Sequence, residues 1–115
     1  MVKIDDYSFG EIEVDGDKYS EDLIIYHDNV ESSWRRKEGH SLYKEDIEDI
    51  LENPPDILII GRGAQGRLRL LPETRRALED KGVKVEDKKT ERACKRFNKL
   101  VEEDEDVAAA LHLTC

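Results

Sequence analysis

Three glycines in the middle of the chain have the spacing of a dinucleotide-binding loop. Gly61, Gly63 and Gly66 form the pattern G-x-G-x-x-G directly after an apolar run. In proteins that bind NAD or FAD, a helix begins inside this pattern and points its amides at the pyrophosphate. Here residues 67–71 separate the pattern from Pro72, where we expect the next helix to begin, so we predict that neither cofactor binds. Two hypotheses remain for the loop: a tight turn that needs glycine, or exposed amides that hold another anion or acyl ligand.

Basic side chains are concentrated in two segments of an acidic chain. Residues 62–76 carry five arginines and one glutamate, and residues 34–40 carry three basic residues and one glutamate, whereas the whole chain has a net charge of -9. Concentrations of this kind suit an anionic ligand, because arginine forms strong hydrogen bonds to carboxylate and phosphate. Half of these side chains can equally pair with neighbouring acids, at little gain in stability.

The segment of residues 34–40 also contains a tryptophan and a histidine. An exposed Trp34 beside Arg35 suits a binding surface, whereas a buried Trp34 would fill the core of a domain with few aromatic residues. The sequence leaves both interpretations open. We predict that the two basic segments meet at one edge of the sheet in an anion-accepting cleft. The cleft is formed by Trp34, Arg35, His40, Gly61, Gly63, Gly66 and Arg67. None of these residues is assigned a catalytic role.

The histidines and cysteines are too few and too dispersed for a structural zinc site, which needs paired ligands at short spacing. They are His27, His40, His112, Cys94 and Cys115. We therefore expect no metal and no bound cofactor. We also expect no disulfide: Cys94 faces the core from a helix, and Cys115 is a free thiol. His112, in an apolar segment, is expected to be a hydrogen-bonded core residue.

The elements that position these residues alternate between extended and helical patterns. The first third is rich in strands, with a hairpin turn at Asp15-Gly16. The remaining expected elements are a helix over 44–52, a strand over 56–60, a helix from Pro72 to Lys81-Gly82, a strand over 83–86, a helix over 91–102 capped by Thr90, and a strand over 107–113. This order predicts a layered α/β domain.

Length and composition limit the possible functions. A chain of 115 residues with 37% apolar residues can form one core, so we expect a single domain over residues 1–115. A pI near 4.8 disfavours nucleic acid and anionic membranes as partners. The chain has no apolar run of membrane-spanning length, and its first residues lack the pattern of a signal peptide. We therefore expect a cytoplasmic protein.

Several motifs together resemble a known family of small domains. They are Tyr7-Ser-Phe-Gly10, Trp34-Arg-Arg-Lys-Glu-Gly-His40, Leu58-Ile-Ile-Gly-Arg-Gly-Ala64, Pro72-Glu-Thr74 and Val107-Ala-Ala-Ala-Leu-His-Leu-Thr-Cys115. In combination they are similar to the Mth-domain family, which includes the mitochondrial complex I assembly factor 3 and the adipogenesis-associated Mth domain-containing protein. The resemblance implies a three-layer α/β fold with a mixed central sheet and an added N-terminal β layer. It implies a binding cleft but supplies no reaction.

Two classes of function follow from these residues. The favoured hypothesis is a non-enzymatic binding or assembly module whose basic, glycine-lined cleft holds a protein partner or a small anionic ligand. The alternative is an enzyme acting on a small anionic metabolite, with His40 as acid or base and Arg35, Arg62 or Arg67 clamping the substrate. The position of His40 relative to the glycine loop discriminates between them, because the enzyme would have no other general base.

Overall fold

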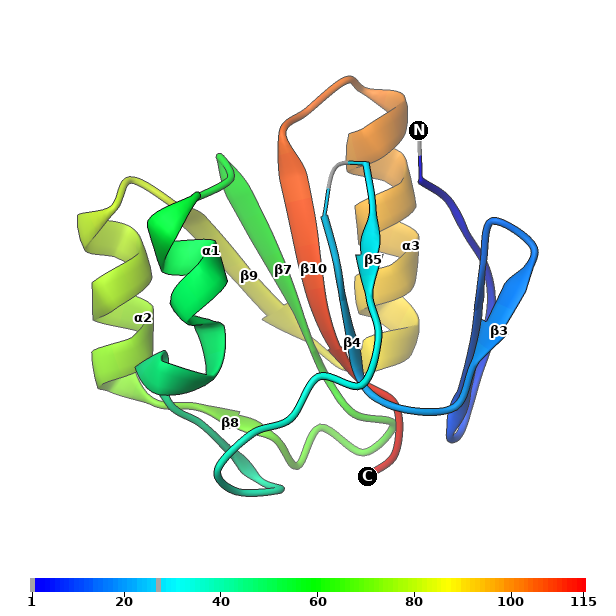
Figure 1. Ribbon diagram of the computed structural model, residues 1–115, viewed down its shortest axis with the longest axis horizontal. Coiled ribbons are helices and arrows are strands. Elements are labelled where there is room, and N and C mark those ends of the chain that lie inside the picture. Colours follow the sequence, from blue (N-terminus) through cyan, green and yellow to red (C-terminus); the bar gives the residue numbers. More distant parts are fainter. Residues whose placement is uncertain (1, 27) are drawn as a thin grey trace.

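A five-stranded mixed sheet runs through the middle of the computed structural model, which describes residues 2–26 and 28–115 (Figure 1). In spatial order its strands are β5 (Val30–Glu31), β4 (Leu23–Ile25), β10 (Val107–His112), β7 (Ile57–Arg62) and β9 (Lys84–Lys88). β10, β7 and β9 are parallel to one another, and β4 is antiparallel to both β10 and β5. β7 and β10 are continuous apolar runs because both faces of these interior strands are covered.

The two faces of the sheet are covered by different layers, which Figure 1 shows on either side of β7 and β10. Ile57 and Ile59 belong to the core on the side of α3 (Thr90–Glu102) and of a second, antiparallel sheet. Leu58 and Ile60 belong to the core on the opposite side. The elements there are a 3₁₀ helix (Lys44–Ile47), α1 (Glu48–Glu52), α2 (Pro72–Asp80) and the parallel pair β6 (Ser41–Leu42) and β8 (Arg69–Leu70). The expected three-layer α/β fold with a mixed central sheet is thus confirmed.

The N-terminal third forms the added β layer. Its strands are β1 (Ile4–Ser8), β2 (Glu11–Val14) and β3 (Asp17–Tyr19), paired in that order. Asp15 and Gly16, with φ of 50° and 84°, both adopt the left-handed conformation between β2 and β3. This is the backbone geometry of a type I′ turn, which matches the twist of the flanking strands. The predicted hairpin at Asp15-Gly16 is confirmed.

The helices begin and end close to their predicted positions. The predicted helix over 44–52 begins as the 3₁₀ helix and continues as α1. α2 begins at Pro72, and Gly82 follows it with a φ of 82°, as the preference of proline and glycine for helix ends predicts. No helix in the described ranges 2–26 and 28–115 is long and apolar enough to span a bilayer.

The predicted capping of α3 by Thr90 is wrong. Thr90 is the first residue of the helix, and no side chain caps the helix at the preceding Lys89. The Thr90 hydroxyl instead donates to the carbonyl oxygen of His112 at 2.6 Å and accepts from the amide of Gly63 at 2.8 Å. The hydroxyl therefore joins α3 to the ends of β7 and β10.

Candidate functional site

Three segments that are distant in the sequence meet where the parallel strands β7 and β10 end. They are residues 34–40, residues 61–67 and residues 112–115. The amides of Ala64 and Arg67 donate to the main-chain oxygens of Thr114 and Cys115, at 2.6 and 3.1 Å. The amide of Arg69 donates to the carbonyl oxygen of His40 at 2.9 Å. We call this region the carboxyl edge; in Figure 1 it lies at the bottom, around the end of β10.

Gly61 and Gly63 allow the glycine loop to pack closely against β10 and the chain that follows it. A Cβ atom on Gly63 would lie 2.6 Å from the carbonyl carbon of Cys115 and 2.8 Å from the His112 ring, and its φ is +100°. A Cβ atom on Gly61 would lie 2.8 Å from the Leu111 side chain. Contacts this short exclude any side chain at these two positions unless the neighbouring atoms move. Close packing against the Cys115 main chain therefore accounts for Gly63, and close packing against the Leu111 and Thr90 side chains accounts for Gly61.

Four amides of this loop donate hydrogen bonds within the protein. Those of Gly63, Ala64, Gly66 and Arg67 all donate to protein oxygens, at 2.6 to 3.2 Å. An amide that already donates to the protein cannot also cradle a ligand. An anion at the carboxyl edge would therefore depend on side chains, and the glycine spacing does not itself make a phosphate loop.

A buried ionic network underlies the carboxyl edge. Asp22 Oδ2 lies 2.7 Å from His112 Nδ1 and accepts a hydrogen bond from Arg36 at 2.8 Å, while its Oδ1 accepts the Leu113 amide at 2.8 Å. The Arg36 guanidinium stacks over the Trp34 ring, 4.8 Å from its centroid. Burial raises the pKa of Asp22, but the hydrogen bonds from His112, Leu113 and Arg36 outweigh it and leave the pKa below its usual value. The Arg36 guanidinium also lies 3.2 Å from His112 Nδ1, so the carboxylate, the guanidinium and the imidazole ring all contact one another.

The structure around this network shows the roles of Trp34 and His112. Trp34 is only 7% exposed, and its indole N–H donates to the carbonyl oxygen of Asp46 at 2.9 Å. Of the two interpretations, Trp34 therefore fills the core rather than forming an exposed surface. His112 is buried and hydrogen-bonded, which confirms its expected role as a core histidine.

The remaining predicted site residues lie in two places. His40, Gly66 and Arg67 lie at the carboxyl edge, where His40 and Arg67 are exposed. Arg35 instead lines, with Trp34, a hollow of about 300 Å³ against the carboxylates at the start of α1. Cys115 contacts both segments, through the Arg67 amide and the His40 ring, whereas Arg35 lines a hollow that does not include Arg67.

Half of the basic residues in the two segments pair with acids. Arg36 pairs with Asp22, Lys37 with Glu45, and both Arg62 and Arg75 with Asp87. The other four make no ion pair with any described residue: Arg35, Arg67, Arg69 and Arg76. Arg67 and Arg69 are both exposed, and their amides donate to the main-chain oxygens of Cys115 and His40, so they provide the free positive charge of the carboxyl edge.

The carboxyl edge also carries a thiol beside an imidazole. Cys115 Sγ lies 3.5 Å from His40 Nε2, a contact between residues 75 positions apart that no local pattern could have indicated. Both cysteines are free thiols, as predicted, and Cys94 faces the core. Burial raises the pKa of the Cys94 thiol to about 12. Cys115, by contrast, is partly exposed.

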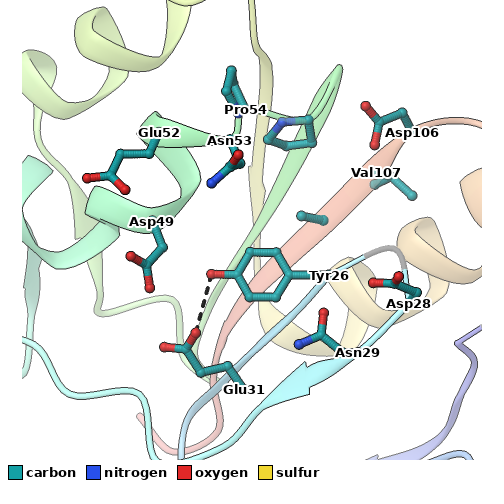
Figure 2. A pocket seen from close by; sticks show the side chains of 12 residues that line it. Tyr26, Asp28, Asn29, Glu31, Asp49, Glu52, Asn53, Pro54, Asp106 and Val107 are labelled. Atoms are coloured by element: carbon teal, nitrogen blue, oxygen red, sulfur yellow. Dashed lines mark hydrogen bonds between the residues drawn. The ribbon is translucent and has the colours of Figure 1, made fainter.

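A larger hollow lies at the opposite end of the sheet, where β7 and β10 begin. Its volume is about 630 Å³, and its acidic lining residues are Asp28, Glu31, Asp49, Glu52 and Asp106. Figure 2 shows Tyr26 with its hydroxyl directed at Glu31. Burial and the charges of Glu31 and Asp49 raise the pKa of Tyr26 to about 12. No motif in the sequence indicated this hollow, and its acidic lining would repel an anion.

The described residues contain no arrangement of three or more His, Cys, Asp or Glu side chains that could hold a metal ion. His27, one of the three histidines considered from the sequence, lies outside the described residues.

Comparisons with known proteins agree on the fold. A family model described as a protein of unknown function (DUF498/DUF598) matches residues 4–112. A conserved hypothetical protein from Pyrococcus horikoshii is 31% identical, with 98% of this chain and 99% of that chain covered and a TM-score of 0.78. The solved protein named MT938 is 29% identical over the whole of both chains, with a TM-score of 0.83. A Mth938-like domain from Bordetella pertussis, 24% identical over 96% of this chain and 85% of its own, has the same fold with a TM-score of 0.70.

Proposed function

The chain belongs to the DUF498/DUF598 family of proteins of unknown function, which includes the Mth938-like domains, and we propose that it is a binding module for an anionic group. The group is bound at the carboxyl edge by the side chains of Arg67, Arg69 and His40. It belongs either to a small ligand or to an acidic segment of a protein partner. No reaction is needed for this function.

The observation that carries this proposal is the free charge of Arg67 and Arg69. Both side chains are exposed and make no ion pair among residues 2–26 and 28–115, although acidic residues outnumber basic ones by 28 to 19 in this chain. Each can donate a charge-assisted hydrogen bond, which contributes about 1.5 to 3 kcal/mol. The adjacent His40 offers a further polar group.

The surrounding structure supports a preorganised site. The buried network of Asp22, Arg36 and His112 joins the segment of residues 34–40 to the end of β10. Gly63 and Thr90 join the end of β10 to the glycine loop. Side chains on a framework fixed in this way lose less conformational entropy when a ligand binds. The buried glycines and Trp34 thus support the site without touching the ligand.

The enzyme alternative keeps one supporting observation, which is the position of His40 beside Cys115 at the carboxyl edge. Arg62, one of its suggested substrate clamps, is already engaged: its guanidinium donates to the carbonyl oxygens of Leu68 and Gly66 at 2.8 and 3.0 Å. Such an enzyme would have to hold a small anionic metabolite with Arg67 alone among the three arginines considered, because Arg35 faces another hollow.

The binding proposal is tested by NMR titration of the ¹⁵N-labelled protein. Phosphate, sulfate and citrate represent small anions, and a glutamate-rich peptide represents an acidic protein segment. We expect chemical-shift changes at Gly66, Arg67, Arg69 and His40. Arg67→Ala should weaken binding by about 10- to 100-fold, the equivalent of one charge-assisted hydrogen bond.

Arg76→Ala is the matched control, because Arg76 is an exposed arginine without an ion pair on α2, among the described residues. It should leave binding unchanged. Equal weakening in both variants would show a non-specific response to charge and would overturn the proposed site. Preference for the peptide over all three small anions would identify the source of the anionic group as a protein.

A further inference from the structure

We propose that Cys115 is a reactive thiol that undergoes exchange with small anionic disulfides, with His40 accepting its proton. The pairing of the Cys115 thiol with the His40 imidazole follows from their positions in the structure and does not depend on the proposed function. The preference for an anionic disulfide rests on the proposed function, because it depends on the same arginines. The site is thus a modification site within the binding surface.

The position of the thiol is fixed by its main chain. The segment carrying Cys115 is held by hydrogen bonds from Ala64 and Arg67 and packs against the bare backbone of Gly63. His40 is held in turn by the hydrogen bond between its carbonyl oxygen and the Arg69 amide. These contacts place Sγ of Cys115 and Nε2 of His40 at 3.5 Å, within reach for transfer of the thiol proton.

The other cysteine shows what an unreactive thiol looks like in this fold. Cys94 is 6% exposed on α3, within the core formed with the N-terminal strands. Its pKa, raised to about 12 by burial, keeps it protonated at neutral pH. Because the thiolate is the attacking species in disulfide exchange, Cys94 should not react in the folded protein. It therefore serves as an internal control for Cys115.

The reaction is balanced without any external oxidant beyond the disulfide itself. The Cys115 thiol transfers its proton to Nε2 of a neutral His40, and Sγ attacks one sulfur of the disulfide R–S–S–R. A new bond forms between Cys115 Sγ and that sulfur, while the original S–S bond breaks and R–S⁻ leaves. His40 returns the proton to the leaving thiolate, so the products are the mixed disulfide and R–SH. Cys115 is oxidised and the departing sulfur is reduced.

Charge around the thiol selects the disulfide. The main chain of Arg67 is hydrogen-bonded to Cys115 and that of Arg69 to His40, so both exposed arginines are anchored beside the Cys115–His40 pair. Lys89 is also exposed, and its side chain lies 3.5 Å from where a Cβ atom on Gly66 would be. A disulfide that carries carboxylates would be concentrated at this surface by electrostatic attraction. A disulfide that carries ammonium groups would be repelled.

The test measures the rate of mixed-disulfide formation with three probes: oxidised glutathione, which is anionic, 2-hydroxyethyl disulfide, which is neutral, and cystamine, which is cationic. Intact-protein mass spectrometry gives the rate, and peptide mapping gives the site. We expect one modification per chain, on Cys115, with the order anionic, neutral, cationic. A synthetic peptide of residues 107–115 gives the intrinsic rate of the same cysteine without His40.

Variants separate the two parts of the proposal. His40→Gln should slow the reaction with all three probes by about tenfold or more, as expected for loss of a general base, while Arg67→Ala should slow only the reaction with oxidised glutathione. Unchanged rates in His40→Gln, or a folded protein that reacts no faster than the peptide, would overturn the reactive thiol. Equal rates for the three probes in a His40-dependent reaction would overturn the anionic preference and the proposed function while leaving the thiol assignment in place.

Discussion

Gly63 has a φ of +100° and lies against the main chain of Cys115, so both its conformation and its surroundings require glycine. The same residue is the second glycine of a pattern that, in dinucleotide-binding proteins, lets a pyrophosphate approach the backbone. Here another part of the chain approaches instead. This loop differs from a dinucleotide-binding loop in the residues that follow it, because β8 and its neighbours separate the glycines from the start of α2.

A series of glycine substitutions separates conformation from packing. Gly39→Ala should leave stability nearly unchanged, because Gly39 has no positive φ and no atom near its Cβ position. Gly82→Ala should lower the free energy of unfolding by about 1 kcal/mol, the cost of a left-handed conformation alone. Gly63→Ala should cost about 1 to 3 kcal/mol more, because it also overpacks the site. Urea unfolding measures all three, and equal losses for Gly63→Ala and Gly82→Ala would contradict the packing described for residues 112–115.

Asp22 should make stability depend on pH in the acidic range. Its pKa is lowered in the folded protein, so its contribution is fully present above its unfolded pKa, near 3.9, and is lost as the pH falls through the folded value. Asp22→Asn should lower the free energy of unfolding at neutral pH by about 3 to 5 kcal/mol, because Arg36 keeps a buried charge without its partner. The variant should also lose less stability than the native protein below pH 4.

The control for Asp22→Asn is Glu45→Gln. Glu45 also has a lowered pKa, through its own backbone and Lys37, but lies in an exposed ion pair. Its replacement should change stability far less, since exposed pairs contribute little. Unfolding followed by circular dichroism between pH 2 and pH 7 compares the two variants. Parallel pH profiles for native protein and Asp22→Asn would show that the buried network is not the source of the dependence.

At the scale of elements, α3 is the part that joins the N-terminal layer to the central sheet. Its buried face contacts β7, β10 and β1. Asn98 pairs with the main chain of Ile4 in both directions, accepting from its amide at 2.9 Å and donating to its carbonyl oxygen at 2.7 Å. This is the hydrogen-bonding pattern that a neighbouring strand would supply. One side chain thus positions β1 on the helix.

Asn98→Ala should loosen the N-terminal layer more than the central sheet. Loss of both hydrogen bonds leaves polar groups of Ile4 without partners, at about 1 to 3 kcal/mol. Hydrogen exchange should become faster in β1, β2 and β3, while β7 and β10 keep their protection. Lys99→Ala, at an exposed position one residue further along α3, should change neither region. Faster exchange spread evenly over the whole chain would argue against a local role for Asn98.

The elements of this fold could be predicted from local patterns, whereas their contacts could not. Proline, glycine and apolar spacing predicted α2, α3, β7 and β10 to within a few residues, because these signals act over one or two turns of chain. β6 and β8 were missed, since two-residue strands carry no periodicity and exist only through pairing with each other. Threonine is a residue type that often caps helices, but the Thr90 hydroxyl binds the distant His112 carbonyl instead. Sequence alone does not distinguish these two roles.

The candidate site was predictable only as a set of segments. Residues 34–40 and 61–67 were identified by charge and glycine spacing, and the structure brings them together through residues 112–115. Which arginines form ion pairs and which remain unpaired was not predictable, because it depends on the acidic residues that lie near each arginine in the folded protein. Arg62 and Arg75 both pair with Asp87, which is distant in sequence, and this leaves Arg67 and Arg69 free.

At the scale of the whole molecule, charge is separated along the direction of the parallel strands. The unpaired Arg67 and Arg69 lie where β7 and β10 end, and the hollow lined by carboxylates lies where these strands begin. Figure 1 shows the course of the two strands between these ends. A separation of this kind gives the molecule an electric polarity that a net charge of -9 does not describe. An approaching anion would therefore be steered away from the acidic hollow and towards the carboxyl edge.

The position of β10 in the middle of the sheet has a consequence for how the protein is made. β10 pairs with β4 on one side and β7 on the other, yet its residues 107–112 follow all the other strands in the sequence. During synthesis, the edges of β4 and β7 that pair with β10 have unpaired backbone groups until residues 107–112 have been made. Such edges are prone to pair with other chains, and sheets closed by distant segments fold slowly. Vectorial synthesis therefore exposes this protein to aggregation until residues 107–112 have been synthesised, and the arrival of β10 completes the sheet and the carboxyl edge together.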